Sequence, residues 1–87
     1  MFRKIVQFSF QKTILKDGNV ISNNYLIDTM YSLARQCHVI VEDFHDSGYQ
    51  DLIITYIKGK QKNIELFIQK FISIMNQYIF NTDIRHL

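Results

Sequence analysis

The chain has 87 residues, a length that fits one domain rather than two. Hydrophobic residues make up 47% of it, with seven Phe and five Tyr, which is enough for a core and excludes a disordered chain. The net charge of +2 is far from the strongly basic balance typical of proteins that act mainly on nucleic acid. Residues 1–87 are therefore expected to form a single domain.

Three features of the sequence bear on location. The single Cys37 has no partner for an internal disulfide, so a secreted, disulfide-stapled scaffold is not expected. The opening residues alternate in polarity instead of forming the apolar run of a signal peptide. The longest apolar-rich stretch, residues 64–80, contains Glu65 and Lys70 and is too polar for a membrane span. We expect a soluble intracellular protein of the cytoplasm or an organellar matrix, with no membrane partner.

The first half of the chain predicts a strand, a turn and a helix. Residues 2–11 alternate, with Val6, Phe8 and Phe10 on one face, which is typical of a half-buried strand. Residues 16–19 read Lys-Asp-Gly-Asn and form a turn signal. Ser22 or Asn23 can cap a helix that follows, with its apolar face spaced by three and four residues as far as Cys37.

The second half predicts a hairpin, a second helix and a short last strand. Residues 38–45 and 49–58 read as two strands joined by a turn at Asp46-Ser47-Gly48. Asn63 can cap a second helix that reaches about Phe80, and residues 81–87 can form a last strand.

The order β-α-β-β-α-(β) predicts an α+β fold. With right-handed crossovers it becomes a ferredoxin-like sandwich, in which two helices cover one face of an antiparallel sheet. We expect the first and third strands to be central and to run parallel to each other. The face with Phe8 and Phe10 is expected to pack under the helices.

The third strand is apolar on both faces, with Ile53 and Ile57 on one and Tyr56 on the other. Because the helices cover only one side of the sheet, these three residues are candidates for a partner interface. A homodimer is the simplest partner arrangement, and another protein is the alternative. Scattered exposed aliphatic side chains with no function would give the same pattern.

Lysines follow the ends of the first and third strands. If both ends lie at one edge, where the helices begin, five lysines gather there: Lys12, Lys16, Lys58, Lys60 and Lys62. The acidic side chains of the hairpin, Glu42, Asp43, Asp46 and Asp51, would then lie at the opposite end. This rim predicts contact with phosphate or an RNA backbone, and a solvated, functionless rim is the alternative.

No set of side chains in the sequence predicts catalysis. His38 and His45 are separated by an odd number of residues and would face opposite ways on a regular strand, so no metal site is predicted. Cys37 lies on the apolar face of the first helix, which indicates a buried, unreactive thiol. The three glycines form no phosphate-binding loop. We expect no enzymatic activity and no cofactor.

Two short stretches are similar to known families. Residues 80–87, Phe-Asn-Thr-Asp-Ile-Arg-His-Leu, resemble the last strand of bacterial-type small-subunit ribosomal protein six. That resemblance implies the β-α-β-β-α-β fold, binding to ribosomal RNA near Arg85, and a protein partner at the edge formed by residues 81–87. Residues 56–64 resemble the third strand and second helix of ACT-like domains, which sense small ligands.

The sequence therefore supports two functional hypotheses. In the first, the chain is a non-enzymatic binding or assembly subunit that acts through its open sheet face, a strand edge or, on RNA, its lysine rim. In the second, it is a small regulatory dimer of the ACT-like type, with a ligand at a strand–helix interface between subunits.

Overall fold

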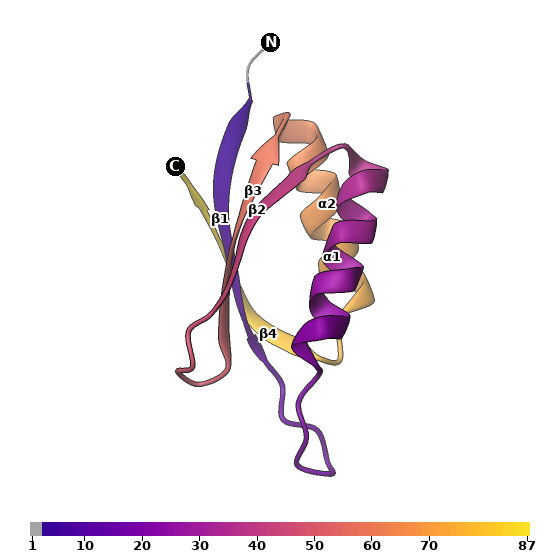
Figure 1. The fold of residues 1–87 in the computed structure, drawn as a ribbon, viewed down its shortest axis with the longest axis vertical. Helices are drawn as coiled ribbons and strands as arrows, with labels where there is room; N and C mark the ends of the chain where they lie inside the picture. Colours follow the sequence, from indigo (N-terminus) through magenta and orange to yellow (C-terminus); the bar gives the residue numbers. More distant parts are fainter. Residues whose placement is uncertain (1–2) are drawn as a thin grey trace.

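The computed structural model describes residues 3–87. Its elements follow the order β1 (Lys4–Lys12), α1 (Asn23–Cys37), β2 (Ile40–Asp46), β3 (Leu52–Gly59), α2 (Gln61–Ile74) and β4 (Ile79–His86). The strands form one antiparallel sheet in the order β2-β3-β1-β4. Both helices cover the same face of it (Figure 1). This is the predicted ferredoxin-like α+β fold.

The first and third strands are central, as predicted, but they run antiparallel. The expectation of a parallel pair is wrong for a topological reason. A right-handed crossover through α1 makes β1 and β2 parallel with a gap between them. The hairpin then places β3 in this gap, opposite in direction to both neighbours. Consequently the end of β1 lies beside the start of β3, with Gln11 opposite Leu52 and Lys4 opposite Gly59.

The core lies between the sheet and the two helices. Val6, Phe8 and Phe10 of β1 are at most 2% exposed, and the Phe8 ring meets Phe71 of α2 edge to face, with centroids 5.9 Å apart. Thr55 is a fully buried polar residue in this layer, and its hydroxyl donates to the Phe8 carbonyl at 2.8 Å. The predicted orientation of β1 is confirmed.

The local signals for α1 also hold. Ser22 is its N-cap, and the Ser22 hydroxyl oxygen accepts from the Tyr25 N–H at 3.2 Å. The helix stops at Cys37 because His38 takes up a left-handed conformation. Cys37 is buried, as its place on the apolar face predicted.

The bounds of α2 differ from the prediction. Lys60 is its N-cap, so Asn63 lies inside the helix, and the last helical residue is Ile74 instead of a residue near Phe80. The chain turns after Met75, where the Tyr78 N–H donates to the Met75 carbonyl at 2.8 Å. This turn lets Ile79 pair with Lys12 at the start of β4, so pairing along the sheet edge replaces the last helical turn. The predicted strand at residues 2–11 begins at Lys4, and Phe2 lies outside the described residues.

Candidate functional site

The pairing of the strands decides which residues of β3 face the helices. Residues opposite each other in an antiparallel pair lie on the same face. Ile57 is opposite Val6 and Ile53 is opposite Phe10, so both isoleucines join the core and are fully buried. Their assignment to a partner interface is therefore wrong. Of the three predicted interface residues, only Tyr56 lies on the open face, where its hydroxyl accepts from Gln7 Nε2 at 3.1 Å.

The predicted lysine rim is divided between the two ends of the sheet. Because β1 and β3 are antiparallel, Lys12 and Lys16 lie at the end opposite Lys58, Lys60 and Lys62. Instead of Lys12 and Lys16, Arg3 and Lys4 lie beside the end of β3. Arg3, Lys58 and Lys60 line one small hollow there. The acidic cluster is divided as well, since Glu42 pairs with Lys58 at 3.9 Å, away from the hairpin turn.

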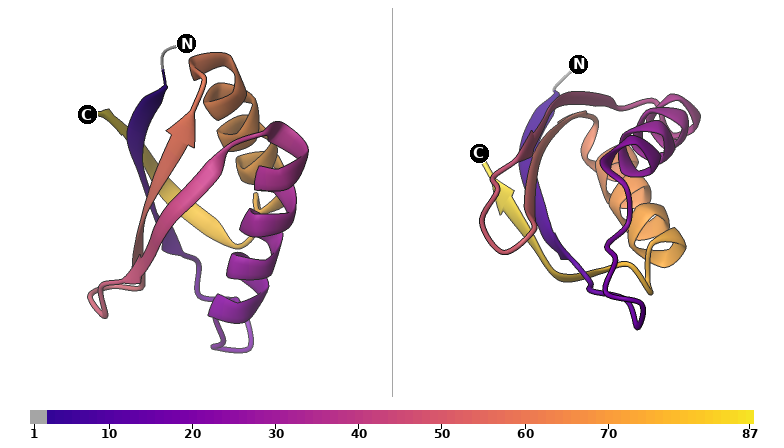
Figure 2. Two further views of the ribbon diagram at one scale, coloured as in Figure 1. Left: turned by 45° about the horizontal axis from the view of Figure 1, so that its top comes forward. Right: turned by 60° about the horizontal axis from the view of Figure 1, so that its bottom comes forward.

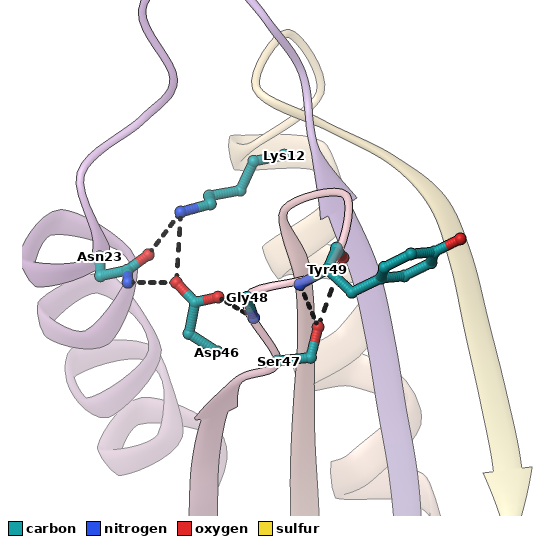
Figure 3. A network of polar contacts seen from close by, with 6 residues as sticks. All are labelled: Lys12, Asn23, Asp46, Ser47, Gly48 and Tyr49. Atoms are coloured by element: carbon teal, nitrogen blue, oxygen red, sulfur yellow. Dashed lines mark hydrogen bonds and ion pairs between the residues drawn. The ribbon is translucent and has the colours of Figure 1, made fainter.

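Lys12 belongs to a polar network that closes the hairpin end (Figure 3). Its side chain is only 7% exposed, and Nζ donates to Asn23 Oδ1 at 2.9 Å and lies 3.6 Å from Asp46 Oδ2. Asn23 Nδ2 in turn donates to Asp46 Oδ2 at 2.8 Å, and the Gly48 N–H donates to Asp46 Oδ1 at 3.0 Å. These bonds join the end of β1, the start of α1 and the end of β2.

The network also sets the acidity of Asp46. The hydrogen bond from Asn23, followed by the one from the Gly48 N–H, lowers the pKa of Asp46 below its ordinary value, and Lys12 contributes in the same direction. The side-chain polar groups of Lys12, Asn23 and Asp46 all have partners within the chain (Figure 3). We therefore assign Lys12 and Asp46 a structural role.

The best-formed groove of the described chain lies between α2 and the edge formed by β1 and β4. Its volume is about 450 Å³. Val6, Ile64 and Ile68 form a buried floor, and Ile72 and Ile84 form the sides. Ile84 is 43% exposed because α2 packs over the centre of the sheet and leaves β4 uncovered. Figure 2 shows β4 at the outer edge, diverging from the helices towards its C-terminal end.

Polar side chains lie at the end of this groove where α2 begins. They are Lys4, Gln61, Glu65 and His86, and Gln69 lies farther along the helix. Lys4 Nζ donates to Gln61 Oε1, and Gln61 Nε2 donates to Glu65 Oε1 at 3.2 Å. The groove thus has an apolar body and one polar end, the usual composition of a small-molecule site.

A larger hollow of about 610 Å³ lies at the hairpin end of the sheet. It is bounded largely by connecting residues, among them Thr13, Ile14, Gln50 and Asp51. We prefer the α2–β4 groove as the candidate site because a helix and two paired strands hold its walls, whereas connecting segments are the more mobile parts of a fold.

The structure does not bring Arg85, His38 or His45 into the groove. Arg85 lies on the open face of β4, where Nε is 3.2 Å from Asp83 Oδ2. His38 caps α1, and His45 lies on the open side of β2 opposite Ile54. Within residues 3–87, no three His, Cys, Asp or Glu side chains come together in a way that suits a metal ion. Within the same residues, no helix has the length and apolar character needed to cross a membrane.

Comparisons with known proteins are informative for the fold. No family model matches the chain, and neither does any curated protein. Among solved structures, formyltetrahydrofolate deformylase from Burkholderia mallei matches with a TM-score of 0.55 at 9% sequence identity. The match covers 97% of this chain and 28% of the deformylase chain, so the likeness concerns one part of that enzyme. It shows a shared ferredoxin-like α+β fold.

Proposed function

We propose that this chain is a non-catalytic ligand-sensing domain of the ACT-like type. The observation that carries the proposal is the apolar groove of about 450 Å³ between α2 and β4, a strand–helix site formed within one chain, whereas the sequence-based hypothesis placed the ligand between subunits. The ACT-like fold supports the same class of function, although a fold alone does not define an activity. The ligand expected here is a small molecule with an apolar body and one polar end.

The structure weakens the competing hypothesis of an assembly subunit acting through the open face of β3. Ile53 and Ile57, which motivated that hypothesis, are core residues. The open face is mixed: half-buried Gln7, Ser9 and Gln11 of β1 lie opposite half-buried Tyr56, Ile54 and Leu52 of β3. Such a surface supports an apolar sheet-to-sheet contact less well than the wholly apolar face that the hypothesis assumed.

The groove contains isoleucines that can report on binding one by one. We would label the isoleucine methyl groups with ¹³C and titrate the protein with 1-hexanol and with hexanoate, which share an apolar chain and differ at the polar end. The methyl signals of Ile64, Ile68, Ile72 and Ile84 should shift and saturate. Those of Ile14 and Ile40, which lie outside the groove, should stay in place.

A pair of matched variants locates the site. Ile84→Ser removes an apolar wall and should weaken binding by about tenfold, since burial of such a side chain is worth about 1.5 kcal/mol or more. Ile14→Ser changes an isoleucine that is 68% exposed and does not line the groove, so affinity should be unchanged. Equal affinity in both variants, or shifts spread over all isoleucines without saturation, would exclude the groove as a ligand site.

A second candidate function is contact with an RNA backbone at the basic end of the sheet. The observation that favours it is the grouping of Arg3 and Lys4 with Lys58, Lys60 and Lys62. A uridine oligonucleotide should then bind with an affinity that falls steeply as salt rises. Changing Lys58, Lys60 and Lys62 together to Gln should remove this binding, whereas Lys16→Gln at the opposite end should not. Salt-independent or unaltered binding would rule this function out.

A further inference from the structure

The sheet has two edges, β2 and β4, and they differ in their protection against pairing with another strand. β2 carries Glu42, Asp43, His45 and Asp46, and its register with β3 shifts between Val41 and Asp43. Acidic side chains and a bulge are the usual means of blocking an edge. β4 also has a register shift, between Phe80 and Asp83, where Asn81 takes up a left-handed conformation. From Asp83 onward, however, β4 is regular and contains one acidic and one basic side chain, Asp83 and Arg85, with Ile84 between them. The β4 edge is therefore the one suited to accept a strand.

The ladder between β1 and β4 shows which backbone groups of β4 point outward. The Leu87 N–H donates to the Ile5 carbonyl at 3.3 Å, and the register continues with Arg85 opposite Gln7 and Asp83 opposite Ser9. In an antiparallel pair, every second residue exchanges hydrogen bonds with the neighbouring strand. Asp83, Arg85 and Leu87 therefore direct their backbone groups to β1. Thr82, Ile84 and His86 direct theirs to the free edge.

We propose that β4 pairs with β4 of a second copy of this chain, antiparallel and centred on Ile84. In this register Ile84 lies opposite Ile84 of the second copy, and Thr82 lies opposite His86 of the second copy. Each outward-directed residue from Thr82 to His86 thus gains a hydrogen-bonding partner. The result is a continuous eight-stranded sheet with all four helices on one side.

The side chains fit the same register. Asp83 of one copy lies opposite Arg85 of the other, twice by symmetry, in the non-hydrogen-bonded pairs whose Cα atoms approach to about 4.5 Å. Both are on the open face, where Arg85 is 72% and Asp83 55% exposed, so both are free to exchange their intrachain contact for one across the edge. A register centred on Asp83 or on Arg85 would place like charges opposite each other.

Pairing also completes the groove. Ile84 lies on the helix side of β4 and is 43% exposed at the groove mouth. Ile84 of the second copy would lie beside it and cover the open side of each groove. The two grooves would then face each other across the symmetry axis. The pairing rests on the β4 edge and goes beyond the proposed ligand function, because it requires no ligand.

Charge exchange at Asp83 and Arg85 tests the register. Sedimentation velocity over a wide range of concentration should show a reversible dimer of the unmodified protein. Asp83→Arg places Arg opposite Arg, and Arg85→Asp places Asp opposite Asp. Each variant should therefore raise the dimer dissociation constant by about tenfold or more. An equal mixture of the two variants should form a heterodimer of near-original affinity, and so should the protein that carries both changes.

Amide hydrogen exchange tests the edge without any substitution. Raising the protein concentration should slow exchange at Thr82, Ile84 and His86, whereas Asp83 and Arg85 should be protected at all concentrations. A protein that stays monomeric at every concentration overturns the proposal. A dimer whose dissociation constant is unchanged by Asp83→Arg and by Arg85→Asp overturns it as well. Because neither experiment includes a ligand, a monomer that still binds 1-hexanol would refute the pairing alone.

Discussion

The two ends of β1 place a lysine in contrasting settings. Lys4 and Lys12 are separated by an even number of residues, so both side chains extend to the helix side of the sheet. Lys12 is 7% exposed and is held by Asn23 and Asp46 (Figure 3). Lys4 is exposed at the mouth of the α2–β4 groove, where Gln61 accepts a hydrogen bond from it.

The difference shows how the same residue type acquires two roles. A buried ammonium group needs partners at all times, because its desolvation cost is otherwise uncompensated. At the hairpin end, Asn23 and Asp46 meet this requirement, so the ammonium group of Lys12 already has its partners within the chain. At the groove end, water solvates Lys4, so its ammonium group can exchange water for a polar ligand atom at small cost.

Of the substitutions considered, replacement of Lys12 should have the largest effect on the free energy of unfolding, and replacement of Lys4 serves as its control. Lys12→Ala leaves Asn23 Oδ1 and Asp46 without their buried donor and should lower the free energy of unfolding by about 2–3 kcal/mol. Lys4→Ala, the matched control on the same strand, should change it by less than about 0.5 kcal/mol. Urea unfolding followed by circular dichroism measures both values. If both variants lowered the free energy of unfolding equally, the structural role of Lys12 and the availability of Lys4 for a ligand would both be contradicted.

A change of pH should affect the hairpin end in a defined direction. The pKa of Asp46 is lowered in the folded protein by the hydrogen bonds from Asn23 and the Gly48 N–H. The stabilisation from Asp46 is therefore fully present above the unfolded-state pKa of about 4 and is lost as pH falls through the lower folded-state value. Below pH 4, the unmodified protein should lose stability more steeply than Asp46→Asn, in which this group no longer titrates.

The control for this measurement is Asp17. Its pKa is also lowered, mainly by a hydrogen bond from the Asn19 N–H, and it titrates alike in the unmodified protein and in Asp46→Asn. The difference between the two acid unfolding curves therefore isolates Asp46. Parallel curves would show that the network of Figure 3 does not favour the charged carboxylate.

Local sequence signals were sufficient for most of the fold. The alternation of Val6, Phe8 and Phe10 identified the buried face of β1, and the two candidate caps, Ser22 and Asn23, placed the start of α1 to within one residue. Both signals depend on neighbouring residues alone. The end of α2 was missed because Ile79 suits a helix and a strand equally well, and its pairing with Lys12 decides between them.

The candidate site was less accessible to sequence reasoning. The prediction of a lysine rim was wrong because the direction of β3 relative to β1 determines which lysines lie together. The prediction assumed parallel strands, which placed Lys12 at the same end as Lys58, whereas the antiparallel pairing places it at the opposite end. The groove depends on where α2 packs across the sheet, which no local pattern specifies. One available signal was the spacing of Ile64, Ile68 and Ile72, which extends the apolar face of α2 along its whole length.

The smallest effect is expected at an ion pair near the groove end. Lys58 and Glu42 are 3.9 Å apart and 37% and 46% exposed, in contrast to the buried Lys12. Exposed pairs contribute little because water and salt screen them, so Lys58→Gln should change the free energy of unfolding by less than about 0.5 kcal/mol. Glu42→Gln should match it, and added salt should reduce the small difference from the unmodified protein. If Lys58→Gln lowered the free energy of unfolding nearly as much as Lys12→Ala, the ion pair at the basic end would be as important for stability as the network at the hairpin end. That result would contradict the proposed difference between the two ends.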